Sequence, residues 1–471
     1  MKTIFISVFE GIEGKNILRT PVVSTLLAEK DIRLVCFTKS WEKVDYYKKE
    51  FPHPRLIFEA VSNFEVKGAE RFFRALRYYL IDTETTRLRA RMIKEREGHF
   101  LKYFWKLALH RLLARPFVRR IVRLLDLFLL RPTTFKQYFE EYKPDLVLSA
   151  QLFEELEVHF IKEAKNRGIK TVCFINSWDK VTARSALRVL ADKFIVFNNI
   201  VKEELMANDD VPAENIFVSG IPQYDQFFDP SSLESLAKDF GKGPITYLNN
   251  KEFLAFNNLS PAQPFILYAP MGVEYSNSDW EIIDLLQKNI QEKVFGGVSL
   301  FVRFPPNDFA NQEEIRKRPW LRFYLPGRRF SKKRGTDWDM DFKDLALLSD
   351  TLRHASLVIC YASSISIDAA VFDKPVVNLD FEVKPGQLMI KSPTRFFDMS
   401  HYKKALATGG IRLVHSKEEL SDWVCKYLSD PSLDRGGRKR LLEEQCLLTD
   451  GNSGERAATR IISFLLPRPK V

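Results

Sequence analysis

Short apolar runs alternate with longer segments of helical pattern in the first half of the chain. Each run is typical of a buried strand, and a helix-length segment separates it from the next. The runs are Thr3 to Val8, Ile32 to Phe37, Leu146 to Ser149, Thr171 to Ile175 and Lys193 to Phe197. This alternation predicts a parallel sheet with right-handed crossovers. The helical stretch from Ala69 to Arg131 interrupts it and is predicted to be an insertion.

A second series of apolar runs follows a polar stretch that is rich in turn-forming residues. The runs are Phe265 to Ala269, Val298 to Arg303, Leu357 to Tyr361 and Pro375 to Leu379. They are typical of buried parallel strands. The pattern therefore predicts an α/β protein with two Rossmann-type domains. The boundaries that we expect are an N-terminal domain at 1–228, a linker at 229–262, a C-terminal domain at 263–452 and a closing helix at 453–471.

Composition narrows the class of protein. Hydrophobic residues make up 45% of the chain and charged residues 28%, as in a soluble globular protein. The five cysteines are scattered without a CxxC pair, which favours a reducing compartment and argues against structural zinc. The first apolar run is too short for a signal peptide, and no run reaches the roughly 20 residues of a membrane span. We therefore expect a cytoplasmic protein.

The net charge of +11 permits phosphate-rich partners, which include nucleic acid, anionic lipid and nucleotides. Basic residues are densest from Arg87 to Arg123, where no recognised nucleic-acid reading module occurs, so no nucleic-acid partner is expected. One helical face there carries Arg119, Arg120 and Arg123, and the opposite face is apolar around Phe117. This segment is either a membrane-surface helix or a hairpin packed on its own domain with solvated arginines.

Ligands of open parallel sheets bind beyond the carboxyl ends of the strands, so candidate chemistry is sought in those loops. In the C-terminal domain Ser363 and Ser364 follow a buried strand and precede a helix, where they either face a phosphate or are ordinary N-cap residues. Asp368, one turn later, orients a ligand hydroxyl or supports the loop. Arg303 ends another strand and is either a phosphate clamp or a surface arginine.

The N-terminal domain offers three carboxylates in such loops. Asp179 is a candidate general base for an acceptor hydroxyl, or caps the next segment through an Asx turn. Asp225 ends the loop that begins at Gly220, and Glu10 follows the first strand; both are rival bases. The neighbouring candidates for contact with an acceptor are Ser177, Trp178, Gln223 and Tyr224.

Other kinds of chemistry receive less support from the sequence. The segment 337–341 carries three aspartates at alternate positions, which suits either a divalent ion or a solvated charged face. The chain has no HExxH, GxSxG or GxxxxGK[ST] motif, which argues against zinc proteolysis, serine hydrolysis and P-loop ATP chemistry.

Four of these blocks resemble enzymes of the GT-B-fold superfamily, particularly CDP-glycerol glycerophosphotransferases and enzymes similar to UDP-GlcNAc 2-epimerase. The segment 361–368 with 375–378 is similar to their donor-phosphate strand, loop and helix. The Arg303-Phe304-Pro305-Pro306 block resembles an Arg-x-His-Pro motif in which Pro305 replaces the histidine. The segments 177–179 and 220–225 resemble two N-domain loops, and Asp179 takes the place of a histidine in the first.

The resemblance implies two domains whose sheets face a cleft, with a C-terminal helix that returns to the N-terminal domain. A nucleotide-sugar donor would contact Arg303, Tyr361, Ser363, Ser364 and Asp368, and the N-terminal domain would hold a glycan or lipid-linked acceptor. A metal is normally unnecessary in this fold, and no cofactor is expected. The implied activity is sugar transfer in bacterial surface-glycan synthesis, in the cytoplasm or peripheral to the inner face of the membrane. The alternatives are a polyol-phosphate transferase, a nonhydrolysing UDP-sugar 2-epimerase and a noncatalytic binding subunit.

Overall fold

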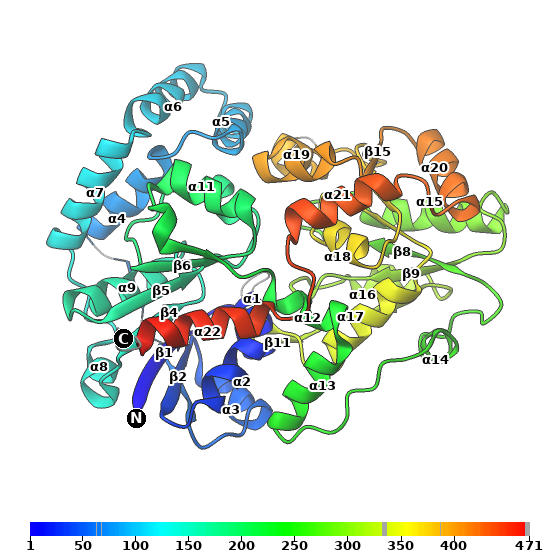
Figure 1. Ribbon diagram of the computed structural model, residues 1–471. Helices are drawn as coiled ribbons and strands as arrows, with labels where there is room; N and C mark the ends of the chain where they lie inside the picture. Colours follow the sequence, from blue (N-terminus) through cyan, green and yellow to red (C-terminus); the bar gives the residue numbers. More distant parts are fainter. Residues whose placement is uncertain (63, 67, 332–336, 387, 467–471) are drawn as a thin grey trace. The chain divides into compact units, whose positions relative to one another are not determined.

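The computed structural model describes residues 1–62, 64–66, 68–331, 337–386 and 388–466 and consists of two compact units. Unit 1 comprises Met1–Ala90, His99–Pro244 and Cys446–Val471, and unit 2 comprises Arg91–Gly98 and Ile245–Gln445. Each unit contains its own parallel sheet with helices packed around it (Figure 1). The predicted α/β class with two Rossmann-type domains is confirmed.

The sheet of unit 1 has seven strands in the order β3-β2-β1-β4-β5-β6-β7, all parallel. The strands are β1 Lys2–Ser7, β2 Ile32–Thr38, β3 Leu56–Ala60, β4 Leu146–Ser149, β5 Lys170–Phe174, β6 Lys193–Val196 and β7 Ile216–Val218. The chain order reverses direction between β1 and β4. This reversal is a topological switch point, the place where open α/β sheets bind ligands.

Phenylalanine rings pack together in the core of unit 1. Phe5, Phe37, Phe135 and Phe160 are buried together, and the rings of Phe5 and Phe37 lie 4.8 Å apart in an edge-to-face arrangement. Such aromatic pairs add stability beyond the area that they bury. The core thereby fixes β1 and β2, whose carboxyl ends carry part of the candidate site.

Helices cover this sheet and close the chain. They are α1 Gly11–Glu13, α2 Pro21–Ala28, α3 Trp41–Glu50, α8 Lys136–Tyr142, α9 Glu155–Asn166, α10 Lys180–Ala183, α11 Asn199–Asp209, α12 Asp225–Phe228, α13 Pro230–Asp239 and α22 Ser453–Leu465. The C-terminal α22 packs against α2 so closely that a Cβ at Gly454 would lie 2.8 Å from Cδ of Pro21. Glycine is therefore required at the start of α22.

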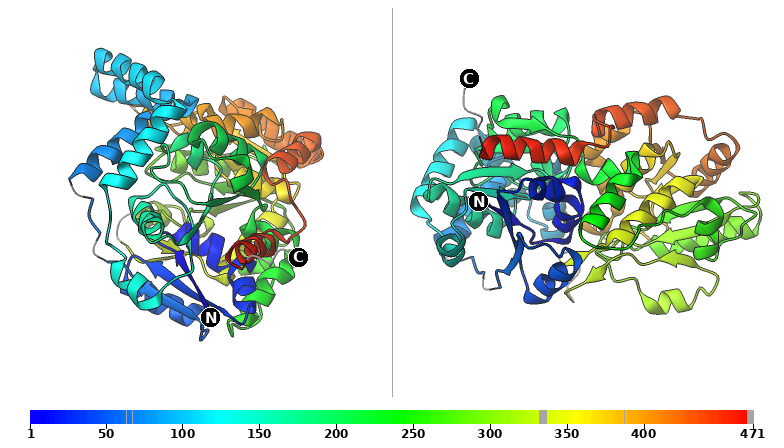
Figure 2. Two further views of the ribbon diagram at one scale, coloured as in Figure 1. Left: turned by 60° about the vertical axis from the view of Figure 1, so that its left-hand side comes forward. Right: turned by 60° about the horizontal axis from the view of Figure 1, so that its bottom comes forward.

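The predicted insertion is helical and consists of α4 Ala69–Leu76, α5 Glu84–Glu97, α6 Phe100–Leu113 and α7 Pro116–Leu129. In the left view of Figure 2, α6 extends away from the sheet of unit 1, and α7 runs back toward it. Within the described ranges, no helix combines the length and the apolar character that crossing a bilayer requires.

The expectation of solvated arginines on a packed hairpin is wrong for two of the three arginines on α7. Arg119 and Arg123 are buried, and only Arg120 is exposed. The guanidinium of Arg119 forms a bidentate pair with Asp210, at 2.8 and 2.6 Å, and Arg123 donates to Asp209 at 3.0 Å. The arginine face of α7 therefore points into the protein, because acidic side chains at the end of α11 neutralise it there.

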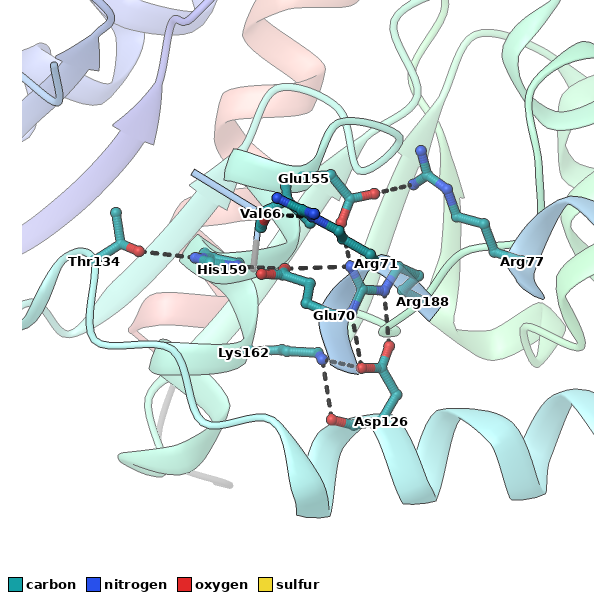
Figure 3. A network of polar contacts seen from close by, with 10 residues as sticks. All are labelled: Val66, Glu70, Arg71, Arg77, Asp126, Thr134, Glu155, His159, Lys162 and Arg188. Carbon is teal, nitrogen blue, oxygen red and sulfur yellow. Dashed lines mark hydrogen bonds and ion pairs between the residues drawn. The ribbon is translucent and has the colours of Figure 1, made fainter. Parts of the chain in front are cut away.

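A second group of buried charges also joins the insertion to the sheet domain (Figure 3). Asp126 of α7 accepts two hydrogen bonds from Arg188, both at 2.8 Å, and one from Lys162 of α9 at 2.5 Å. Arg188 also pairs with Glu155 and with Glu70 of α4. Buried charges with several partners hold α4 and α7 in one position on α9, because losing any partner leaves another charge unpaired.

The sheet of unit 2 has six parallel strands in the order β10-β9-β8-β13-β14-β15. They are β8 Phe265–Ala269, β9 Ser299–Arg303, β10 Arg322–Tyr324, β13 Leu357–Cys360, β14 Val376–Leu379 and β15 Arg412–Val414; β11 Arg328–Arg329 and β12 Trp338–Asp339 form a separate antiparallel pair. The helices are α14 Asn250–Phe256, α15 Asp279–Gln291, α16 Gln312–Arg316, α17 Phe342–His354, α18 Ile365–Val371, α19 Ser400–Ala407, α20 Lys417–Ser429 and α21 Arg435–Gln445. The switch point of this sheet lies between β8 and β13.

Candidate functional site

Arg303 is the most unusual side chain at the carboxyl edge of the unit 2 sheet. It ends β9, it is only 5% exposed, and its Nη1 has no hydrogen-bond partner among the described residues. Burial lowers the pKa of Arg303 to about 10, and the nearby charges of Asp344 and Asp368 act against that shift. A buried guanidinium with an unused donor is costly, so this position favours an anionic ligand.

The loop after β13 contains the predicted serines, and a tyrosine packed against the loop holds it in place. The hydroxyl of Tyr402 on α19 accepts from the Ser363 N–H at 3.2 Å and donates to Oδ1 of Asn378 at 2.6 Å. Ser366 lies 3.0 Å from the same hydroxyl. Tyr402 therefore positions the loop at the switch point, and sequence reasoning missed it because it comes from a helix that follows the strand by about forty residues.

The predicted donor residues differ in how available they are. Ser364 is exposed and its side chain does not cap α18, whereas Ser363 accepts a weak 3.4 Å hydrogen bond from Ile365 N–H. Asp368 is buried, and its charge acts on Arg303. Tyr361 is also buried, and its hydroxyl donates to the carbonyl oxygen of Phe381 at 3.1 Å. That contact assigns Tyr361 a packing role beneath the loop.

Asp279 organises the loop on the other side of the switch point. Its carboxylate accepts from the N–H of Gly272 at 2.7 Å, from the N–H of Met271 at 3.2 Å and from the Tyr268 hydroxyl at 2.8 Å. Burial raises the pKa of Asp279 to about 6, although these hydrogen bonds oppose the shift. Beyond the ends of β8 and β9, a pocket of about 630 Å³ is lined by residues that include Gly272, Asp279 and Phe304. Unit 2 thus has a preformed space at the carboxyl edge of its sheet.

The aspartates of 337–341 are engaged within the protein. Asp341 is the N-cap of α17 and accepts from the Asp344 N–H at 2.8 Å, and Asp339 is buried in β12. Across the described ranges, no group of three or more His, Cys, Asp or Glu side chains is arranged to hold a metal ion.

In unit 1 a buried polar cluster occupies the switch point between β1 and β4. Glu13 is fully buried, and its Oε2 accepts from the N–H groups of Phe9 and Glu10 at 2.5 and 3.1 Å. Gln151, after β4, donates to Glu13 at 2.7 Å and to Glu10 at 3.3 Å. Lys180, after β5, donates to the side-chain oxygen Oε1 of Gln151. Three strand-end loops are therefore tied together through one glutamine.

Burial is the main cause that raises the pKa of Glu13 to about 7, and the charge of Glu10 acts in the same direction. Burial and then the charge of Glu13 raise the pKa of Glu157 well above its usual range, and Oε1 of Glu157 has no partner in the described part of the chain. Shifted carboxyl groups at a switch point are typical of functional sites. Of this cluster only Glu10 was predicted from the sequence, although polar Glu13 and Gln151 at strand ends also gave a signal.

The three predicted bases have different surroundings. Asp225 is fully buried, and its two oxygens accept the N–H groups of Ser453 and Gly454 at 2.9 and 2.7 Å. It caps α22, so we assign it a structural role instead of a catalytic one. Asp179 is half-buried and accepts from the Ser177 hydroxyl. Glu10 is also half-buried and lies at the switch point, 4.0 Å from Nζ of Lys39.

The predicted acceptor loops pack against each other through aromatic rings. Trp178 lies 6.0 Å from Tyr224 and 5.5 Å from Phe197, measured between ring centroids. Tyr224 and Gln223 are buried, and Oε1 of Gln223 has no partner among the described residues. The loops after β5 and β7 are thus brought together, with the half-buried Trp178 between them.

Comparison with solved structures identifies the fold. The UDP-GlcNAc 2-epimerase from Neisseria meningitidis bound to UDP-GlcNAc matches with a TM-score of 0.56 and 10% identity, covering 98% of this chain and all of that chain (100%). A putative UDP-N-acetylglucosamine 2-epimerase from Listeria monocytogenes gives 0.54 and 12%, covering 100% and 98%. A variant of the wall teichoic acid polymerase TagF with CDPG gives 0.52 and 11%, covering 98% and 88%.

No protein-family model matches the chain, and the search of curated proteins gives no match. At these identities the structural matches establish the fold alone. They agree with the resemblance drawn from the loops after β5, β7, β9 and β13. The chain has the two-domain GT-B-like fold that UDP-GlcNAc 2-epimerases and TagF also have.

Proposed function

We propose that the chain is a glycosyltransferase that binds a nucleotide-sugar donor in unit 2 and transfers the sugar to a hydroxyl acceptor. The observation that carries the proposal is the buried Arg303, whose Nη1 lacks a partner in the described chain at the ligand-binding edge of the sheet. A diphosphate would satisfy this donor. It would also gain the fixed positive charge that stabilises a leaving diphosphate during transfer.

The biological setting that we propose is bacterial surface-polysaccharide or glycolipid synthesis at the inner face of the membrane. The solved structures with this fold include a wall teichoic acid polymerase. They also include an epimerase bound to UDP-GlcNAc. In the proposed reaction the donor's diphosphate is the leaving group, and neither a cofactor nor a metal ion takes part.

We propose Asp179 as the base that removes the acceptor's proton. It is accessible on the loop after β5, and its neighbour Trp178 provides an aromatic surface of the kind that sugars pack against. Asp179→Asn keeps the shape of the side chain and removes the base. Turnover should fall by roughly a hundredfold to ten-thousandfold while donor affinity is unchanged.

Glu10→Gln is the matched comparison, because Glu10 is the other half-buried carboxylate among the predicted bases. A near-normal rate for Asp179→Asn together with a large loss for Glu10→Gln would transfer the role to Glu10. The rates are measured as release of nucleotide diphosphate from UDP- or CDP-activated donors in the presence of a hydroxyl acceptor.

A nonhydrolysing 2-epimerase is the second candidate. The carboxyl groups of Glu10 and Glu13 both accept from Nε2 of Gln151 at the unit 1 switch point, and burial raises the pKa of Glu13 to about 7, which suits removal and return of a proton. The two functions differ in their products. A transferase releases the nucleotide only when an acceptor is present, whereas an epimerase converts the UDP-sugar to its isomer without one. Nuclear magnetic resonance of the donor with and without acceptor distinguishes them.

A further inference from the structure

Helices α6 and α7 expose apolar side chains over much of their length. On α7, Phe117, Ile121, Leu124 and Phe128 recur at the spacing of one helical face, and Phe128 is 70% exposed. On α6, Leu101 and Trp105 are 76% and 70% exposed. We call this set the apolar face, with these further exposed members: Phe100, Phe104, Leu109, Leu112, Leu125 and Leu129.

This arrangement is the reverse of an ordinary surface helix, which buries its apolar stripe. The inner side of α7 is occupied by Arg119, Arg123 and Asp126, all paired with buried groups of the same unit. The helix therefore cannot rotate to bury its leucines without breaking these ion pairs. Exposed apolar patches of this extent mark a protein or membrane interaction site.

The charges around the apolar face have one sign. From Gly98 to Arg131 the sequence contains a single acidic residue, Asp126, and it is buried. The exposed ionised side chains of this stretch are all basic, and they are Lys102, Arg111, Arg115, Arg120 and Arg131. Two copies meeting through the same face would bring these charges against each other, so self-association is disfavoured.

An anionic bilayer suits both the apolar face and the basic side chains around it. Aromatic and aliphatic side chains enter the boundary between headgroups and acyl chains, and the surrounding Lys and Arg bind lipid phosphates. Next to the face, a groove of about 710 Å³ begins at Arg120 and Leu124 and continues past Leu190 and Val211. Its lining is partly apolar and holds the ion pairs of Lys165 with Asp192 and of Arg123 with Asp210, so the exposed basic residues outside it are the ones that would bind lipid phosphates.

We infer that α6 and α7 dock the protein on an anionic membrane surface by inserting the apolar face, with the surrounding basic side chains on the headgroups. This inference does not depend on the donor site, because it concerns residues of the insertion alone. It also differs from a basic helix that presents its arginines to lipid, since Arg119 and Arg123 are held inside the protein.

The test is vesicle flotation of the full chain. Wild type should float with vesicles of equal parts phosphatidylcholine and phosphatidylglycerol, less with phosphatidylcholine alone, and less at about 0.5 M salt. A quadruple serine variant at Phe117, Ile121, Leu124 and Phe128 should bind at least about tenfold more weakly. A triple glutamine variant at Arg111, Arg115 and Arg120 should lose the preference for the anionic lipid.

The control replaces two exposed apolar residues outside α6 and α7, Trp41→Ser and Phe256→Ser, and should bind as wild type does. Circular dichroism and donor binding are measured on every variant, so that a misfolded protein is recognised. The inference is overturned if wild type does not bind the anionic vesicles at low salt. It is also overturned if the serine variant binds them equally well, or if wild type is a dimer that this variant converts to monomer.

Discussion

At the scale of single residues, chemical environment separates the candidates more than residue type does. Asp225, Asp179 and Glu10 were equivalent in the sequence as carboxylates in strand-end loops. The structure gives Asp225 two backbone donors at the start of α22, which is a contact 228 residues away in the chain. No local pattern predicts such a partner. Only Asp179 and Glu10 stay accessible enough for an acceptor to reach.

Glu13 leads to a prediction about the pH dependence of stability. Its pKa is about 7 in the folded protein against 4.5 in an unfolded chain, so the folded state binds the proton more tightly. The contribution of this group to the free energy of unfolding is therefore largest below about pH 4.5 and is lost as the pH rises to about 7. Because a tenfold difference in proton affinity is worth about 1.4 kcal/mol, we expect a loss on the order of 1–3 kcal/mol over this range.

The measurement is urea unfolding of wild type and Glu13→Gln at several pH values between these limits. Because the glutamine does not ionise, the variant should become more stable relative to wild type as the pH rises. A constant difference between the two proteins across the range would show that Glu13 is ionised in the folded state, against our account.

At the scale of elements, hydrophobic runs predicted the central strands and missed three of the strands at the sheet margins. β3, β10 and β15 each lie at an edge of their sheet and were not predicted. β3 alternates buried and half-buried positions, so its apolar run is interrupted. Central strands are covered on both faces and read as continuous apolar runs. Edge position thus explains these omissions.

Amphipathic pattern correctly predicted that α7 is a helix but not which face is buried. The outcome depends on Asp209 and Asp210, which lie 86 and 91 residues from the arginines that they bind. Local hydrophobicity favours burying the leucines, and the buried ion pairs override it. The identity of a helix's partner must be known before its inner face can be predicted.

The charged contacts of α7 supply a prediction at this scale. Asp126→Ala leaves Arg188 and Lys162 buried without their main acceptor, so unfolding free energy should fall by about 3–5 kcal/mol. Arg120→Ala changes an exposed side chain on the same helix and should stay within about 0.5 kcal/mol of wild type. Chemical denaturation measures both variants. Equal stability of the two variants would mean that the buried network does not hold α7 in place.

At the scale of the whole molecule, the fold could be predicted from the sequence because strands and helices alternate regularly in both sheets. Candidate residues for donor binding could be proposed for the same reason, since parallel strands bring their carboxyl ends to one edge of the sheet. The Glu13, Gln151 and Lys180 cluster was not, because it joins three loops from β1, β4 and β5 through one side chain. Predicting such a cluster requires knowledge of the order of strands in the sheet, which the hydrophobic pattern does not give.

The central claim is that unit 2 binds a nucleoside diphosphate through Arg303. Isothermal titration with UDP, CDP and the matching nucleosides tests it on wild type, Arg303→Ala and the exposed control Arg316→Ala. We predict that Arg303→Ala weakens binding of the preferred diphosphate by roughly tenfold to hundredfold, with little change for its nucleoside and none for the control. Equal losses for diphosphate and nucleoside, or no binding of either diphosphate to wild type, would contradict the account.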